Sequence, residues 1–362
     1  MRFLAASLLL SLAAPAFADA EKGVSHFTLD NGLDVVVIED ARAPSVVQML
    51  WYKIGSADEA PGKSGIAHYL EHLMFKGTDT LEPGELSRRV TANGGMDNAF
   101  TSYDFTTYFQ RIASDRLEMV MEMEADRMSN LRIGDDDWQA ERQVVLEERA
   151  QRVDSNPRAL FAEERSAVQF YNHPYGRPVI GWRAEMEALT RDDAEAWYDA
   201  HYAPNNAVLV IAGDVTEAQV RDLAERYYGP AEARPEALRS ARPQEPAQQS
   251  PRRMELRDPR VAQPVFSRSV LVPQRVSGDQ DQAAALTVLA ALLGGSPQTS
   301  VLAQEMMMEG TALFTSAGYS GLSVDPTTFT LMMVPADGLG TDEAEAALDA
   351  VLARFLETGP DA

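Results

Sequence analysis

The stretch that decides both the fold and the chemistry of this chain is Gly65-Ile-Ala-His68-Tyr-Leu-Glu71-His72-Leu-Met-Phe-Lys-Gly77. Its apolar residues recur at helical spacing, so we predict a helix with its N-cap at Ser64 and its end at Gly77. His68 and His72 are four residues apart and therefore lie on one face of this helix. Two imidazoles at this spacing beside the Glu71 carboxylate predict a zinc site with a base next to the metal.

The alternative interpretation is that the two histidines fall four residues apart by accident, because short motifs always produce false matches. The chain contains only five histidines in 362 residues, and the slot before the second one of this pair holds a glutamate. The order H-x-x-E-H is the inverse of the H-E-x-x-H motif and is the inverzincin signature. We therefore favour the metal site over the accident.

A catalytic zinc usually has three protein ligands and one water, so the pair of histidines needs a third partner. A helix is predicted from Asp135 through Arg149, and its Glu141 and Glu148 are seven residues apart on one face. One of these glutamates can bind the metal while the other orients a ligand. Spacing alone does not choose between them, and a solvated acidic helix face is the alternative.

Composition limits the class of partner. Of the 362 residues, 45% are hydrophobic, which is enough for a large core and for two domains. The formal net charge of −23 argues against nucleic-acid phosphate and gives no support for an anionic membrane surface. Because the chain has no cysteine, it has no disulfides, and its metal ligands must be histidines or carboxylates.

The first residues have the pattern of an export signal. Arg2 provides the positive charge, and residues 3–14 form an apolar run too short to span a bilayer. The small residues of Ala16-Phe17-Ala18 predict cleavage after Ala18, with Ala18-Asp19-Ala20 and an uncleaved anchor as alternatives. No other segment is apolar enough to span. We expect a periplasmic or secreted protein whose mature form has no membrane span.

Apolar periodicity predicts both strands and helices in residues 24–228. Strands are expected at 32–38, 46–54 and 207–212, and helices at 85–93, 114–131 and 216–228. The Thr-, Phe- and Tyr-rich segment from Met96 to Arg111 should be extended. On composition alone, this segment is more typical of an ordinary core or edge strand than of a binding strand.

These motifs resemble those of the pitrilysin/insulinase family of zinc peptidases, which includes the mitochondrial processing peptidase. The resemblance covers residues 24–228 with specific motifs and residues 263–340 more weakly. Besides Gly55-Ser56, Glu59 and Gly65 to Thr78, it rests on Asn98 to Asp104, Glu141-Arg142 with Glu147-Glu148, His173-Pro-Tyr-Gly176 with Gly181-Trp182, and Tyr202 to Asn206 with Gly213-Asp214.

The resemblance implies a role for each site residue and one Zn²⁺ per chain. The zinc ligands of the family fall on His68, His72 and Glu148, the general base on Glu71, and the supporting glutamate on Glu141. The implied activity is that of a metalloendopeptidase or oligopeptidase, with Glu71 taking a proton from water and returning it to the leaving amine.

The resemblance also implies how the substrate binds. The family's edge strand, which pairs with the backbone of an extended or unfolded peptide, falls on four consecutive residues: Asn98, Ala99, Phe100 and Thr101. Backbone hydrogen bonds would give affinity, and pockets for alternate side chains would give selectivity. This implication replaces the interpretation of residues 96–111 as a plain strand.

The implied fold is α+β, with two related domains that each have a mostly antiparallel sheet packed by helices. We expect a signal peptide at 1–18, a catalytic domain at 24–228, a Pro-rich linker at 229–263 and an inactive peptidase-like domain at 264–362. In that last domain, strands are expected at 264–273 and 329–335, and helices at 279–293 and 341–357. It should be truncated, because a complete copy would need roughly another 60–90 residues.

The second half departs from the family pattern in one respect that concerns partners. Many active members carry an Arg and a Tyr here that reach the active site, but the segment from Leu302 to Ser316 has neither, and Tyr319 is out of register. One hypothesis is a heterodimer in which a related subunit supplies both groups, and a homodimer is another. The alternative function is a non-catalytic binding or assembly subunit of a peptidase-like complex.

Overall fold

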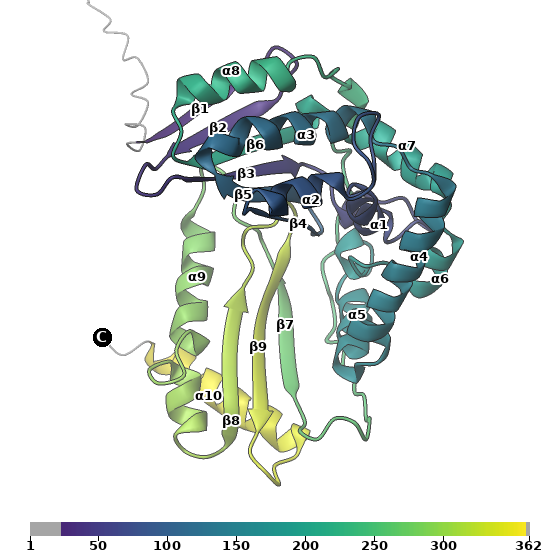
Figure 1. Cartoon of the computed structure of the whole chain (residues 1–362). Helices are drawn as coiled ribbons and strands as arrows, with labels where there is room; N and C mark the ends of the chain where they lie inside the picture. The colour runs from purple at the N-terminus through teal and green to yellow at the C-terminus, as the bar shows by residue number, and fades with distance from the viewer. Residues whose placement is uncertain (1–22, 360–362) are drawn as a thin grey trace, which may run out of the picture.

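The computed structural model describes residues 23–359. The expected cleavage site at Ala18 lies outside the described residues. Two sheets with packed helices make up the fold (Figure 1). This arrangement confirms the predicted α+β class. No helix among residues 23–359 combines the length and the apolar character needed to cross a membrane.

The first sheet has six strands in the order β1-β2-β6-β3-β5-β4. Neighbouring strands are antiparallel except for β2 and β6, which are parallel. Strand β4 ends the order and pairs only with β5, so its other edge is free within the described chain. The strands are β1 Val24–Thr28, β2 Asp34–Glu39, β3 Ser45–Tyr52, β4 Met96–Thr101, β5 Thr106–Ala113 and β6 Ala207–Gly213.

One face of this sheet is buried beneath helices. Every second residue of β3 is buried, as the two-residue period of a strand with one covered face requires. Helix α1 contacts β4 and β5, α3 contacts β3 and β5, and α8 contacts β2. The helices of this part are α1 Ile66–Leu73, α2 Glu85–Ala92, α3 Leu117–Asn130, α4 Asp135–Arg149, α5 Pro157–Gln169, α6 Arg183–Ala188, α7 Arg191–His201 and α8 Glu217–Tyr227.

The segment between α8 and the second sheet is mostly irregular, as its prolines predict, with one short 3-10 turn at Pro235–Ala237. It is anchored rather than loose. The buried guanidinium of Arg242 forms ion pairs with Asp58, Asp104 and Asp325 at 2.8, 2.6 and 2.9 Å. Arg242 therefore ties the first sheet's loops to the turn between β8 and β9. The boundaries at residues 228 and 263 stay a prediction.

The second sheet has three antiparallel strands in the order β7-β9-β8. Helix α9 packs on β8 and β9, and α10 packs on β7 and β9, around a second apolar core. In Figure 1 this unit lies below the first sheet, with β9 at its centre. Its elements are β7 Phe266–Val272, α9 Asp281–Gly294, β8 Ala312–Tyr319, β9 Thr327–Pro335 and α10 Thr341–Thr358.

Candidate metal centre

Helix α1 begins one residue later than predicted, and a distant residue caps it. Its N-cap is Gly65, with a positive φ of 92°. The Ser64 hydroxyl accepts a hydrogen bond from the Trp182 amide instead, so the predicted Ser64 cap is wrong. The buried Glu59 carboxylate accepts hydrogen bonds from the Gly65 and Ala67 amides at 3.0 Å. A carboxylate is favourable at this positive end of the helix dipole.

Helix α1 ends at Leu73, four residues before the predicted stop at Gly77. It packs against α4, and the Tyr69 hydroxyl donates a 2.9 Å hydrogen bond to the Trp138 carbonyl of α4. At the far end of α4, the buried Arg149 guanidinium binds Glu163 of α5 at 2.8 Å and the Gly181 carbonyl at 2.7 Å. The packing and the Tyr69 bond thus hold α1 beside α4, and Arg149 holds the end of α4 against α5.

The structure brings together the three predicted metal ligands from these two helices. One ligand atom each from His68, His72 and Glu148 lies within 4.8 Å of the other two. The Glu148 Oε2 atom is 3.2 Å from His72 Nε2 and 3.7 Å from His68 Nε2. Two imidazoles and one carboxylate form a donor set that zinc accepts, and the three leave a coordination position open.

Glu141 contacts His72 on the side of the ring opposite Glu148. Its Oε1 atom is 2.8 Å from His72 Nδ1, which must donate the proton to the carboxylate, and its Oε2 atom is 2.6 Å from the Lys76 ammonium. This bond leaves His72 Nε2 as the nitrogen that faces Glu148. Of the two glutamates that spacing left open, the structure thus brings Glu148 next to the Nε2 atoms of both imidazoles and Glu141 to the other ring nitrogen of His72.

Electrostatics differ between the two imidazoles. Burial, and then the neighbouring His72, lower the pKa of His68 to about 4, so its ring is neutral at pH 7. Burial also disfavours a charged His72, but hydrogen bonds with Glu141 and Glu148 outweigh it and raise its pKa to about 9. A metal ligand must be unprotonated, so metal binding at His72 Nε2 requires the release of this proton.

Glu71 points toward the edge strand and takes no part in the ligand triad. Its Oε2 atom accepts a 2.6 Å hydrogen bond from the Thr101 hydroxyl at the end of β4. Burial raises the pKa of the Glu71 carboxyl, against the lowering effect of the Thr101 hydrogen bond. A carboxylate with a raised pKa is better matched to proton transfer near neutral pH.

The four residues predicted to bind substrate lie on β4, at the free edge of the first sheet. Asn98, Ala99, Phe100 and Thr101 pair with residues of β5 on one side only. The Ala99 amide donates to the Asn98 side-chain oxygen at 2.8 Å, so this amide is directed away from the β5 ladder. An extended chain that replaced the Asn98 side chain there would continue the sheet.

Sequence reasoning assigned no role to two cations at this site. Lys76 follows His72 by four residues and binds Glu141, whereas Arg152 follows Glu148 by four residues and binds its Oε1 atom at 2.6 Å. The i,i+4 spacing from Glu148 to Arg152 is a signal that could have identified the second cation. Glu59, which caps α1, has no signal of this kind, because its contact depends on the path of the loop.

Replacing Glu141 with glutamine should lower the affinity for zinc about 10- to 100-fold, because His72 loses the partner that fixes its ring and raises its basicity. Competition with a fluorescent zinc chelator measures the dissociation constant directly. Glu147, which is exposed on the same helix, provides the matched control for the loss of one carboxylate. Equal zinc affinities for Glu141→Gln and Glu147→Gln would contradict the assigned role of Glu141.

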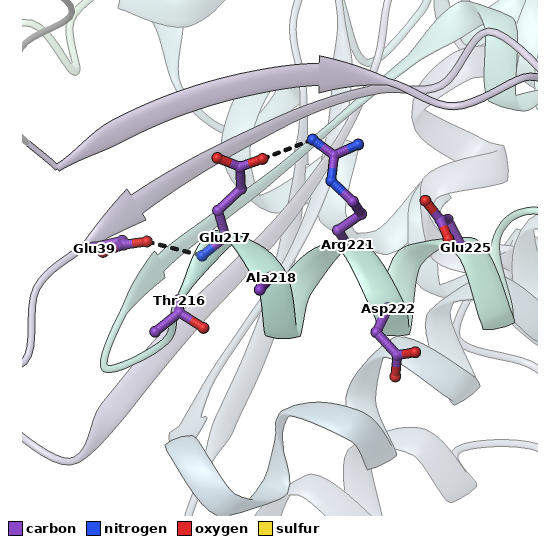
Figure 2. A pocket seen from close by; sticks show the side chains of 7 residues that line it. All are labelled: Glu39, Thr216, Glu217, Ala218, Arg221, Asp222 and Glu225. Carbon is purple, nitrogen blue, oxygen red and sulfur yellow. Dashed lines mark hydrogen bonds and ion pairs between the residues drawn. The ribbon is translucent and has the colours of Figure 1, made fainter.

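A second candidate is a hollow of about 550 Å³ along α8 (Figure 2). Four of its lining residues are acidic, and its one arginine, Arg221, is paired with Glu217 at 2.6 Å. The Glu217 amide at the start of α8 is bonded to Glu39, and Thr216 caps the helix. Most of the polar groups along this hollow are thus bound to one another, and no histidine is among its described lining residues.

Comparison with known proteins assigns both parts of the chain to one peptidase family. Residues 34–182 match the profile of the insulinase family (peptidase family M16), and residues 188–362 match that of the peptidase M16 inactive domain. The zinc protease PqqE of Helicobacter pylori is 37% identical over 202 residues, which are 56% of this chain and 46% of that protein. An uncharacterised zinc protease of Mycobacterium leprae is 36% identical over 207 residues, 57% of this chain and 46% of that protein.

The similarity to solved structures extends over a longer stretch of the chain. The crystal structure of a protease from Helicobacter pylori has a TM-score of 0.84 and 30% identity, covering 94% of this chain and 81% of that one. The periplasmic protease PqqL from Escherichia coli has a TM-score of 0.82 at 23% identity, covering 94% of this chain and 38% of that one. In sequence, the matched part spans about half the length of the curated relatives.

Proposed function

This chain belongs to the insulinase family, peptidase family M16, and we propose that it is a zinc-dependent peptidase that hydrolyses extended or unfolded peptides. The observation that carries the proposal is the placement of Glu71. Its carboxylate lies between the turn that bears His68 and His72 and the free edge strand β4, where Thr101 binds it at 2.6 Å. A site that only stored zinc would have no use for this carboxylate.

In this proposal, His68, His72 and Glu148 hold the metal, and Glu141 orients His72. Bound zinc supplies a Lewis acid that can lower the pKa of water to about 7. Glu71 accepts the proton of the attacking water and returns it to the nitrogen of the leaving amine. The Thr101 hydroxyl holds one carboxylate oxygen of Glu71 and leaves the other for this transfer.

Strand β4 aligns the peptide. Peptide backbone paired with its free edge lies parallel or antiparallel to residues 98–101, next to Glu71. A folded domain presents few strands with unpaired edges, so this mode of binding favours unfolded or extended segments.

A quenched fluorescent peptide of extended sequence tests the function. We expect hydrolysis by the zinc-loaded chain, loss of hydrolysis after treatment with a chelator, and recovery when zinc is added back. Mass spectrometry of the products should show internal cleavage. A folded, zinc-loaded chain that leaves a varied set of such peptides intact would contradict the proposal.

A scan of N-methylated peptides tests the role of β4. Each N-methyl group removes one backbone donor, and an edge-bound strand directs only every second donor to its neighbour. We expect kcat/KM to fall about fivefold or more at alternate positions and little at the positions between them. Equal sensitivity at every position would argue against pairing with β4.

A non-catalytic binding subunit is the alternative function. It would bind the same extended peptides on β4 but release them uncleaved, so hydrolysis by the isolated chain separates the two. The heterodimer remains a further proposal. One support is the absence of Arg and Tyr from Leu302 to Ser316. Another is that the nearby Tyr319 does not supply the missing group, because its hydroxyl is bound to the Pro273 carbonyl at 2.8 Å. Full activity of the purified chain alone would remove the need for a partner.

We also propose that the protein works in the periplasm or outside the cell. The support is the export signal expected in residues 1–18. N-terminal sequencing of the protein recovered from an exporting host would give Asp19 as the first residue.

A further inference from the structure

Two cations form ion pairs with carboxylates of the candidate metal centre, and they differ in exposure. The Lys76 ammonium binds Glu141 at 2.6 Å, and its side chain is 21% exposed. The Arg152 guanidinium binds Glu148 Oε1 at 2.6 Å, and its side chain is 72% exposed. Lys76 is therefore enclosed with its partner, whereas most of Arg152 faces solvent beside the site.

Arg152 uses little of its hydrogen-bonding capacity in this pair. A guanidinium carries five N–H donors in a planar fork, and the contact with Glu148 runs through Nη1. The contact takes the Oε1 atom of Glu148, and the Oε2 atom remains directed at the two imidazoles. Within the part of the chain that the structure describes, the remaining donors of Arg152 thus stay available while Glu148 keeps one oxygen for the metal.

The backbone places Arg152 at the site by an unusual turn. Residues Ala150–Asp154, directly after α4, form a π-helical turn instead of continuing the α-helix. Single π-turns within helical segments are rare and frequently occur at functional sites. The buried Arg149, bound to Glu163 and Gly181, holds the start of this turn in place.

From these contacts we propose that Arg152 binds a carboxylate of the peptide substrate and makes this site selective for peptides with an acidic group near the cleaved bond. The inference rests on the proposed function and names the substrate class. The carboxylate is either an Asp or Glu side chain or the C-terminus, since a planar guanidinium recognises the same two oxygens in both.

The acidic character of the whole chain increases the importance of Arg152 for binding an acidic peptide. A net charge of −23 repels acidic peptides in general. Within the site, Arg152 is near enough to the Glu71 and Glu148 carboxyls to lower their pKa values. An acidic peptide would therefore depend on Arg152 more than a neutral peptide does.

Peptide binding measured without cleavage tests the inference. The parent is the zinc-loaded Glu71→Gln variant, and fluorescence anisotropy gives the dissociation constants of labelled peptides. One peptide pair differs only in a C-terminal acid or amide, and a second series replaces Gln by Glu at successive internal positions of the amidated peptide. We expect the acidic member of at least one pair to bind about fivefold or more tightly.

The added Arg152→Gln substitution should reduce that preference to about one, and Arg152→Lys should keep part of it. Arg257→Gln is the matched control, because it removes the same charge from an exposed arginine of the connecting segment. It should leave the preference unchanged. The zinc content of each variant is measured in parallel, and binding is compared at saturating zinc, so altered metal affinity is not mistaken for altered selectivity.

Equal binding of acidic and neutral peptides by the parent would overturn the inference, as would a preference that survives Arg152→Gln. Because the parent does not need to cleave, this result is separate from the test of the proposed function. A wild-type chain that hydrolyses no peptide contradicts the peptidase, whereas the ratio of dissociation constants decides the role of Arg152.

Discussion

Replacing Glu71 with glutamine is expected to reduce peptide hydrolysis about a thousandfold or more while the chain keeps its zinc. Glutamine has nearly the same shape and can still accept the Thr101 hydrogen bond, but it cannot take a proton from water. General base catalysis by a positioned side chain contributes roughly 10²- to 10⁴-fold. The expected loss is therefore in kcat, with KM for the same peptide changed little.

Single-turnover kinetics with a quenched peptide and zinc analysis of the same samples measure this effect. Glu147→Gln removes one carboxylate from the exposed side of α4 and should retain full activity. Substantial hydrolysis by Glu71→Gln would show that another group moves the proton. Loss of zinc in Glu71→Gln would place this residue among the ligands instead.

Replacing His68 with asparagine is expected to lower the affinity for zinc at least about 100-fold, because one of three protein ligands is lost. Of the predicted ligands, His68 is the one whose replacement disturbs the fewest other contacts. Its Nε2 atom faces Glu148, and its buried Nδ1 atom has no hydrogen-bond partner among residues 23–359, whereas His72 is also bound to Glu141. As the amount of bound zinc decreases, the rate of hydrolysis should decrease with it. The rate of His68→Asn should therefore lie well below that of the Glu141→Gln variant.

Thermal unfolding with and without zinc measures the same loss independently of activity. A ligand at 100 times its dissociation constant stabilises the folded chain by about 2.7 kcal/mol, so wild type should unfold at higher temperature in zinc. At that concentration zinc should stabilise the His68→Asn variant, whose affinity is at least about 100-fold lower, by no more than about 0.4 kcal/mol. An undiminished shift would mean that zinc binds elsewhere in the chain.

The grouping of His68, His72 and Glu148 was predictable because it depends on helical spacing and family resemblance. Four residues separate His68 from His72 and seven separate Glu141 from Glu148, so each pair shares a helix face in any α-helix. Spacing could not decide which glutamate binds, because that depends on how α4 is offset against α1. The Tyr69 contact with Trp138 helps set that offset, and nothing in the spacing predicts it.

Capping and burial were less predictable. Serine is a favoured N-cap residue, so Ser64 was expected to cap α1. Instead, the Glu59 carboxylate in the preceding loop accepts the hydrogen bonds of the α1 amides, and the Ser64 hydroxyl accepts one from the Trp182 amide. Glu124 and Arg127 are three residues apart like an ordinary surface ion pair. They are buried under the first sheet, where the guanidinium lies 4.4 Å from the ring centroid of Tyr108. Tertiary packing decides these cases.

In the second sheet, too, only part of the structure could be predicted from the sequence. The strand expected at residues 329–335 is confirmed as part of β9, whose buried and partly buried residues alternate along its length. Strand β8 has no regular alternation and contains a register shift between Ala312 and Phe314, so sequence periodicity missed it. Arg242 lies in a Pro-rich segment, and its burial depends on three carboxylates brought together from distant loops.

The most direct test of the account is a zinc titration of the metal-free chain in which bound zinc and peptide hydrolysis are followed together. We predict that the rate rises in proportion to bound zinc and saturates at one ion per chain, and that Glu71→Gln binds the same amount without hydrolysis. Hydrolysis that does not depend on zinc, or a wild-type chain that stays inactive with one zinc bound, would contradict the account.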